Sequence, residues 1–226
     1  LELGACDGLL YSNTKFFEKY LGFSGILIEP VKEYYDKLIK NRPNNICYNY
    51  AISSTKLYIG ILVNNAVSGI KQHMTKTFID IWHPKSEFRK VKTITLSNIF
   101  QDKNIKYIDF FSLDVEGGEL DVLNTIDWKN ITIYLICIEL DVYNTESNEK
   151  CRKILIDNGF IFKIKMSINE FWVNPKYFRK NILFDSSKRD KFTGNMNDYG
   201  KHIYLAPHCK PIIEKTIYEF ENIAEI

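Results

Sequence analysis

The sequence predicts an α/β fold in which a mostly parallel sheet carries helices on both faces. Segments of strand length alternate with amphipathic segments of helix length along most of the chain. Most of the strand segments are apolar throughout, which is typical of strands buried on both faces of a parallel sheet. The last two strand segments, residues 160–166 and 170–174, are joined by a short turn, which predicts an antiparallel hairpin.

The length and composition of the chain limit the classes of protein that it can be. Its 226 residues, 45% of them apolar, suit one domain with a substantial core. The net charge of +2 gives no general attraction to nucleic acid or to a membrane, so we expect neither as a partner. Five scattered cysteines without a C-x-x-C pair predict reduced thiols in a cytoplasmic protein rather than disulfides or a zinc site.

The first half of the chain contains, in order, an expected helix over residues 12–22, a strand over 25–30, a helix over 31–43 and a strand over 46–52. Ser12 and Asn13 are suited to cap the first helix, and Gly22 is suited to end it. Pro30 ends the strand that follows, and Pro43 comes after a helix whose apolar residues recur at helical spacing. The chain begins without Met inside an expected strand, which indicates that a preceding piece was cut away.

The second half repeats the pattern, with expected strands over residues 107–114 and 132–140 and expected helices over 117–126 and 147–158. Two segments depart from it. Residues 55–98 are predicted to be an insert with a strand pair and a helix between the two strands. Residues 181–226 are predicted to be an extension made of a polar loop, a strand and an amphipathic helix. We expect this last helix either to pack on its own domain or to join two copies of the chain as a homodimer.

The first turn, residues 4–8, has the features of a ligand-binding turn. Gly4 lets the chain leave the first strand, and Gly8 lets the backbone approach a ligand to which the next helix directs its free N–H groups. Glu29 follows about twenty residues later, at a strand end where a carboxylate accepts hydrogen bonds from ribose hydroxyls. These features favour a nucleotide-like ligand, and a tight turn beside a surface Glu is the simpler alternative.

Three details favour S-adenosylmethionine over NAD as that ligand. Leu9 stands where the dinucleotide fingerprint needs glycine or alanine. Glu2 lies inside the first strand, where a carboxylate needs the ammonium group of a ligand or a backbone amide as its partner. The expected sheet also ends in an antiparallel hairpin, which S-adenosylmethionine methyltransferases have and simple dinucleotide folds lack.

Acidic residues gather at the ends of two further strands. Asp114, Glu116 and Glu119 follow one of them, and Glu139 lies near the end of the next. Because ligands bind beyond the carboxyl ends of parallel strands, we expect Asp114 and Glu116 to face the first turn. Glu119 suits the start of a helix instead. Carboxylates this close together need a cation, an amino group or an abstractable proton as their partner.

The chain resembles the FkbM family of S-adenosylmethionine-dependent methyltransferases in four stretches, residues 1–43, 91–100, 107–123 and 136–140. The resemblance implies a Rossmann-like class I methyltransferase domain over residues 1–180, interrupted by the insert. It implies a seven-stranded sheet of order 3-2-1-4-5-7-6 in which strand 7 is antiparallel. It also implies O-methylation, often of a sugar or polyketide hydroxyl.

The resemblance further implies a set of cofactor-binding residues, namely Glu2, Gly4, Ala5, Asp7, Gly8, Asn13, Thr14, Glu29, Pro30, Ala51, Ile52, Asp114 and Val115. An alcohol acceptor needs a general base, for which Glu116 and Glu139 are the candidates, with Asp114 in a positioning role. We expect no metal in the site, and a Mg²⁺ ion held by these three carboxylates is the less favoured alternative.

The function that we expect is S-adenosylmethionine-dependent O-methylation of a small-molecule or glycan acceptor, at a hydroxyl of a sugar. Two alternatives stay open. The chain could be a non-catalytic binding module that keeps the fold, or a methyltransferase that acts on a small molecule other than a sugar. An NAD-dependent sugar enzyme is disfavoured by Leu9.

Overall fold

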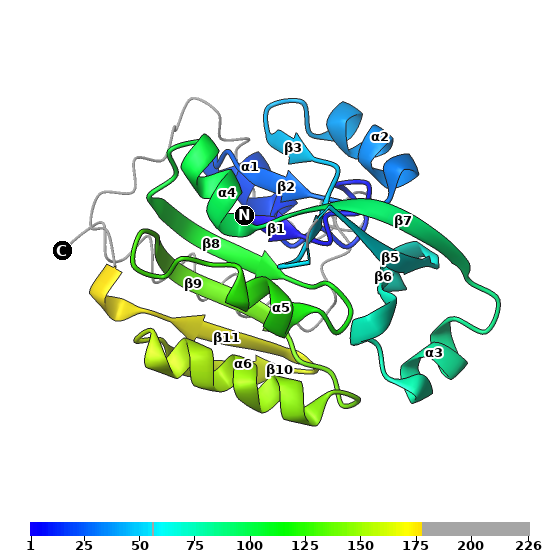
Figure 1. Ribbon diagram of the computed structural model, residues 1–226. Coiled ribbons are helices and arrows are strands. Elements are labelled where there is room, and N and C mark those ends of the chain that lie inside the picture. Colours follow the sequence, from blue (N-terminus) through cyan, green and yellow to red (C-terminus); the bar gives the residue numbers. More distant parts are fainter. Residues whose placement is uncertain (56, 178–226) are drawn as a thin grey trace.

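The computed structural model describes residues 1–55 and 57–177, and this part of the chain forms two sheets with helices around them (Figure 1). The larger sheet consists of β1 (Glu2–Leu3), β2 (Ile26–Ile28), β3 (Ile46–Tyr48), β8 (Tyr107–Leu113), β9 (Thr132–Glu139), β10 (Ile161–Met166) and β11 (Asn169–Val173). The smaller sheet consists of β4 (Ala51–Ile52), β5 (Tyr58–Val63), β6 (Gly69–Ile70) and β7 (Glu87–Ile94). The helices are α1 (Lys15–Leu21), α2 (Lys32–Asn41), α3 (Lys76–Trp82), α4 (Leu96–Asp102), α5 (Glu119–Asn124) and α6 (Thr145–Asp157), with short 3₁₀ turns η1 (Asn65–Val67), η2 (Lys71–His73) and η3 (Pro175–Tyr177).

The larger sheet has the strand order β10-β11-β9-β8-β1-β2-β3. Its strands β1, β2, β3, β8 and β9 pair in parallel, whereas β11 is antiparallel to both β9 and β10. The expected α/β architecture with a large, mostly parallel sheet is therefore confirmed, and so is the terminal hairpin.

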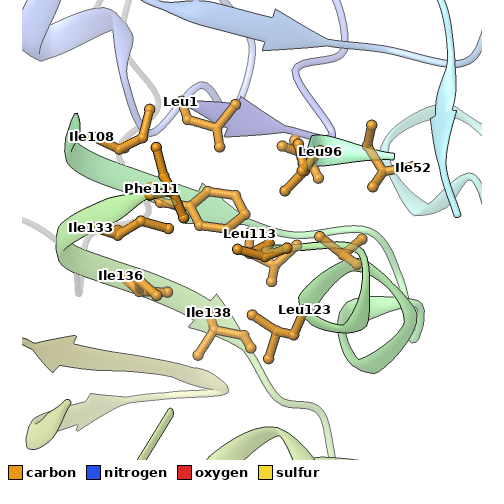
Figure 2. Packing of buried hydrophobic residues seen from close by; sticks show 14 of the residues in the cluster. Leu1, Ile52, Leu96, Ile108, Phe111, Leu113, Leu123, Ile133, Ile136 and Ile138 are labelled. Carbon is orange, nitrogen blue, oxygen red and sulfur yellow. The ribbon is translucent and has the colours of Figure 1, made fainter. Parts of the chain in front are cut away.

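Helices cover both faces of this sheet because successive side chains of a strand point to opposite faces. Ile26 and Ile28 of β2 belong to the main core, which packs against α4, α5 and α6. Figure 2 shows Leu96 of α4 and Leu123 of α5 within this core. Leu27, between them, packs on the other face with Leu38 of α2. Strands that are buried on both faces read as continuous apolar segments, and such segments located these strands in the sequence.

The smaller sheet is the main difference from the expected architecture. The antiparallel pairing of β5 with β7 confirms the strand pair expected within residues 55–98. However, β6 joins β5, and β4 joins β7, so the described part of the chain has a four-stranded sheet in addition to the seven-stranded one.

The single strand expected over residues 46–52 is wrong, because this segment divides between the two sheets as β3 and β4. Asn49 lies at the division, and its side-chain amide donates hydrogen bonds to the carbonyl oxygens of Glu29 and Pro30. These bonds tie the chain to the end of β2 and so end its pairing along that strand.

The first helix ends as expected, at Gly22, whose φ of 69° is left-handed. It begins later than expected, at Lys15, and the hydroxyl of Ser12 accepts the N–H of Lys15 at 3.1 Å. The domain boundary at residue 180 stays a prediction. The loop, strand, helix and homodimer contact expected within residues 181–226 lie outside the described residues. Within the described part of the chain, no helix combines the length and apolarity that crossing a membrane requires.

Candidate active site

A cavity of about 520 Å³ lies at the carboxyl ends of β1, β2, β8 and β9, between the larger sheet and the smaller one. It brings together residues that are far apart in the sequence. The expected site residues that line it are Glu2, Gly4, Asn13, Glu29, Pro30, Ala51, Ile52, Asp114, Val115, Glu116 and Glu139. The expected site residues that do not line it are Ala5, Asp7, Gly8 and Thr14.

Glu29 is a buried carboxylate in the cavity wall. One of its oxygens accepts the N–H of Cys6 at 2.9 Å, and the other accepts the N–H of Val31 at 2.7 Å. Burial raises the pKa of Glu29 to about 7, although the two amide bonds act in the opposite direction. Glu29 therefore joins the first turn to the start of α2, and each of its oxygens keeps capacity for a further donor.

Gly4 brings the first turn against the end of β8. A Cβ atom added there would lie 2.0 Å from the carbonyl oxygen of Asp114, and the φ of Gly4 is 76°. No other residue fits this position without moving one of the two segments. The glycine thus places the Asp114 backbone directly beside the turn that leads toward Glu29.

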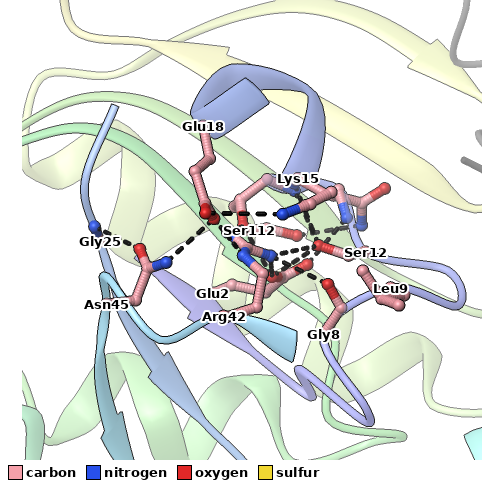
Figure 3. A network of polar contacts seen from close by, with 12 residues as sticks. Glu2, Gly8, Leu9, Ser12, Lys15, Glu18, Gly25, Arg42, Asn45 and Ser112 are labelled. Carbon is pink, nitrogen blue, oxygen red and sulfur yellow. Dashed lines mark hydrogen bonds and ion pairs between the residues drawn. The ribbon is translucent and has the colours of Figure 1, made fainter. Parts of the chain in front are cut away.

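Glu2 has its partners within the protein (Figure 3). Its carboxylate accepts hydrogen bonds from the Ser12 hydroxyl, the Asn13 backbone N–H and the Thr14 hydroxyl, at 2.7–2.9 Å. The buried guanidinium of Arg42 lies 3.8 Å away. A backbone amide, and not only a ligand, therefore satisfies the need for a partner that the sequence indicated.

The four expected residues outside the cavity support the first turn instead. A Cβ atom at Gly8 would lie 2.6 Å from Leu38 and 2.7 Å from Arg42, so this glycine permits close packing on α2 rather than approach to a ligand. Asp7 accepts the N–H groups of Leu9 and Leu10 at 2.9 Å and 2.8 Å. Ala5 is buried in the core on the α2 face, and Thr14 belongs to the network around Glu2.

Asp114, Glu116 and Glu139 form an acidic cluster at the other side of the cavity, with carboxylate oxygens that lie within 4.8 Å of one another. The carboxyl groups of Glu139 and Asp114 are near enough for a proton bound to one of them to be shared with the other. Burial, followed by repulsion from Asp114, raises the pKa of Glu116 and of Glu139. Burial also raises the pKa of Asp114, whereas its hydrogen bond with Glu139 lowers it. The spacing of these three oxygens is compatible either with a bound metal ion or with a shared proton.

Glu119 differs from these three acids, as expected. Its buried carboxylate accepts the N–H groups of Val115 and Gly117 at 3.1 Å and 3.3 Å and so closes the turn before α5. In the same turn Glu116 has a φ of 57°, which a residue with a side chain rarely adopts. The turn thus holds the Glu116 carboxyl group at the cavity.

The model of the FkbM methyltransferase domain matches residues 2–162, which is most of the chain. The chain belongs to the FkbM methyltransferase family. Comparisons with curated proteins and with solved structures found no match. The matched range contains the first turn, Glu29 and the acidic cluster, so both sides of the cavity belong to the FkbM domain. The protein is therefore a methyltransferase by family, and the cavity is its candidate active site.

One wall of the cavity is formed by part of the segment 55–98, which the sequence indicated only as an insert. This wall segment, residues 65–70, lines the cavity from the smaller sheet. A Cβ atom at Gly69 would lie 2.9 Å from that of Glu116, so the wall segment touches the acidic cluster. His83, which is buried, donates from Nε2 to the carbonyl oxygen of Val67 at 2.8 Å and accepts at Nδ1 from Ser86 at 2.7 Å. It thereby fixes the wall segment to the end of α3.

Sequence reasoning missed two other contributions to the site. Arg42 is buried and supports the first turn through the carbonyl oxygen of Gly8 and the hydroxyl of Ser12, both at 3.1 Å. Its position after α2 resembles that of any basic residue at a helix end, so no local signal marked it. Tyr34 and Tyr50 line the cavity as well. In the sequence, Tyr34 lies in the apolar stripe of an expected helix and Tyr50 lies in an expected strand, so both were compatible with ordinary core residues.

Proposed function

We propose that this FkbM-family protein transfers a methyl group from S-adenosylmethionine to a hydroxyl group of a sugar or glycan. One relationship carries the proposal: Glu29 and the acidic cluster line the same cavity, on the two sides of Gly4. A buried carboxylate suits the ribose hydroxyls of a nucleoside. The acidic cluster suits a positively charged group beside the reacting atoms.

The residues around the cavity fit this cofactor. Glu29 would hold the ribose, and the buried side chains of Ala51 and Ile52 would contact the adenine ring. Gly4 lets the first turn lie directly against the Asp114 backbone, and the methionine part would lie beside both in the cavity. The cofactor supplies a methyl group activated by a positively charged sulfur, so the protein needs mainly to bind, orient and accept a proton.

The proton of an acceptor hydroxyl must reach a base, and a carboxyl group acts as a base only when it is ionised. In the acidic cluster, the hydrogen bond between Glu139 and Asp114 raises the pKa of Glu139 and lowers that of Asp114. Glu139 therefore holds a proton more firmly than Asp114 does. A positive charge in the cavity lowers the pKa of each carboxyl group and so prepares Glu116 or Glu139 to accept a proton.

A Mg²⁺ ion on the acidic cluster remains the less favoured alternative. The spacing of the three oxygens suits a cation, but a proton shared between Asp114 and Glu139 would offset part of their repulsion without one. Calorimetric titration of the purified protein with MgCl₂ at neutral pH distinguishes these cases. We expect no saturable binding, and tight binding that is lost in Glu139→Gln would favour the metal.

Calorimetry with S-adenosylmethionine, S-adenosylhomocysteine and NAD tests the cofactor. We expect the first two to bind and NAD not to bind. Labelled methyl transfer to neutral glycans, charged glycans, nucleotide sugars and non-sugar alcohols then tests the acceptor. If S-adenosylmethionine does not bind to the folded protein, the binding-module alternative holds. If only a non-sugar alcohol is methylated, the protein is a methyltransferase for another small molecule.

A further inference from the structure

A second hollow, about 580 Å³ in volume, adjoins the cavity, and Pro30 and Tyr50 line both. We call it the basic hollow. It is bounded by the start of α2, by β3 and the residues after it, and by residues 89–92 of β7. The candidate active site of the FkbM domain therefore continues at Pro30 and Tyr50, on the side proposed for the nucleoside, into a second concave surface.

The basic hollow lies where two strands have open edges. β3 is the last strand of the larger sheet. On the side of β7 away from β5, β4 pairs only at Thr93 and Ile94, which leaves residues 87–92 without a partner strand among the described residues. The space between these two edges is thus open, and its backbone polar groups are free to meet a ligand or water.

The side chains around the basic hollow are cationic and aromatic. They include four cations, Lys32, Arg89, Lys90 and Lys92, and four tyrosines, Tyr35, Tyr48, Tyr50 and Tyr58. No carboxylate is among the described residues that line it. The positive surface therefore favours a negatively charged ligand, and the tyrosine rings offer flat faces on which a ring can pack.

Two of the four cations already have acidic partners beside the hollow. Lys32 pairs with Asp36, and Arg89 pairs with Glu33 and Glu87. These carboxylates are about half exposed, and such surface pairs are weak enough to exchange for a ligand. Lys90 and Lys92 are exposed and make no ion pair within the described part of the chain, so they carry the available charge.

We propose that the basic hollow binds a negatively charged saccharide, and that this saccharide is the part of the acceptor chain remote from the reacting hydroxyl. The acceptor assignment rests on the proposed function. The acidic cluster repels anions, so the charged units of an acceptor would be excluded from the reacting end and attracted to Lys90 and Lys92. The two hollows meet at Pro30 and Tyr50, so a chain of several sugar units that reaches both would pass beside the bound nucleoside.

Calorimetry with three tetrasaccharides of equal length tests this assignment. One contains uronic acids, one contains sugar phosphates and one is neutral. We expect both charged tetrasaccharides to bind at least 10-fold more tightly than the neutral one, with an affinity that falls as salt rises. The stronger of the two charged ligands identifies carboxylate or phosphate as the preferred group. Equal affinity for charged and neutral tetrasaccharides would overturn the proposal.

Variants of exposed residues locate the binding without disturbing the fold. We expect Lys90→Ala with Lys92→Ala to weaken the charged tetrasaccharides at least 10-fold, and the two Lys→Arg changes to preserve binding. The matched control, Lys150→Ala with Lys153→Ala on α6, removes the same charge elsewhere and should leave the affinity unchanged. An equal loss in this control would show that only net charge matters and would overturn the assignment.

The aromatic part of the proposal depends on Tyr58, which is 53% exposed. Tyr58→Ala should weaken the charged tetrasaccharides several-fold, whereas Tyr58→Phe keeps the ring and should retain most of the affinity. A poly-glutamate peptide is the competing ligand. If it binds more tightly than both charged tetrasaccharides, the hollow recognises an acidic protein and the saccharide proposal is wrong.

The binding of S-adenosylmethionine separates this proposal from the proposed function. We expect the Lys90/Lys92 variant to bind it as the unchanged protein does, because neither lysine lines the cavity. If the cofactor binds and no charged saccharide does, only the basic hollow is misassigned. If charged saccharides bind and the cofactor does not, the hollow is a saccharide site on a protein without the proposed activity.

Discussion

Carboxylate oxygens of Glu139 and Asp114 lie within 4.8 Å of each other at the ends of the neighbouring strands β9 and β8. Two carboxylates do not approach in this way unless at least one of them holds a proton or a cation lies between them. Glu116 lies beside both, so three acids share one small volume in the wall of the cavity. Ionising all three carboxyl groups in this volume therefore destabilises the folded protein.

Glu139→Gln should stabilise the protein above neutral pH. The pKa of Glu139 is raised in the folded state, so its contribution to stability is complete below the unfolded value near 4.5 and is lost as the pH rises. Glutamine keeps a donor for Asp114 and removes that loss, which should add roughly 1–3 kcal/mol to the free energy of unfolding at pH 8–9. Near pH 4 the two proteins should be equal. Urea unfolding across this pH range measures the difference.

The control for that prediction is Glu146→Gln, an exposed carboxylate at the start of α6 that pairs with Lys150. It should not stabilise the protein at any pH, because its pKa is lowered rather than raised. If Glu139→Gln unfolds as early as the unchanged protein at pH 9, the acidic cluster does not strain the fold. If Glu139→Gln is instead more stable and has lost methyl transfer, the loss of activity is not caused by unfolding and supports Glu139 as the base.

Glu29→Gln should remove the discrimination between ribose and an analogue without its hydroxyls. We expect the unchanged protein to bind S-adenosylhomocysteine about 10–100-fold more tightly than its 2′,3′-dideoxy analogue, since one hydrogen bond to a charged group contributes about 1.5–3 kcal/mol. In Glu29→Gln the two affinities should converge. Glu29 also accepts the N–H groups of Cys6 and Val31, so its replacement can change the shape of the site and lower both affinities. The ratio of the two affinities therefore reports on the ribose contact, whereas either affinity alone does not. An unchanged ratio would contradict the ribose assignment.

Gly4→Ala should be strongly destabilising. The added methyl group would meet the carbonyl oxygen of Asp114 at 2.0 Å, and the φ of 76° disfavours any side chain. We expect a loss of at least about 2–3 kcal/mol in the free energy of unfolding. Gly25→Ala is the matched control, since its Cβ atom would lie 3.3 Å from the side-chain oxygen of Asn45. A similar small effect at both positions would mean that the first turn moves freely relative to β8.

Arg42→Met should cost about 3–5 kcal/mol in the free energy of unfolding, because it leaves the buried carboxylate of Glu2 without a cation. Guanidinium contacts to Gly8, Ser12 and Glu18 are lost with it. The double variant Glu2→Gln with Arg42→Met removes the uncompensated charge and should recover part of this loss. Urea unfolding of the two single variants and the double variant measures the coupling. Additive losses would show that the two side chains act independently.

Much of the fold could be predicted because local rules and tertiary packing agree in most elements. Continuous apolar segments located β2, β8 and β9, and Gly22 marked the end of α1. Prediction failed at Asn49, where one apolar segment divides between two sheets. Apolar periodicity reports burial but not the sheet in which a segment is buried, so the smaller sheet could not be read from it.

By itself, the sequence determined the alternation of strands and helices, the glycine turn after β1 and the positions of acids at strand ends, since these depend on neighbouring residues. The tertiary structure decided what those residues contact. It placed Gly8 against α2 rather than at the cavity, gave Glu2 its partner in Arg42, and brought Glu139 to Asp114. Such pairings join residues far apart in the chain, and packing in three dimensions selects them.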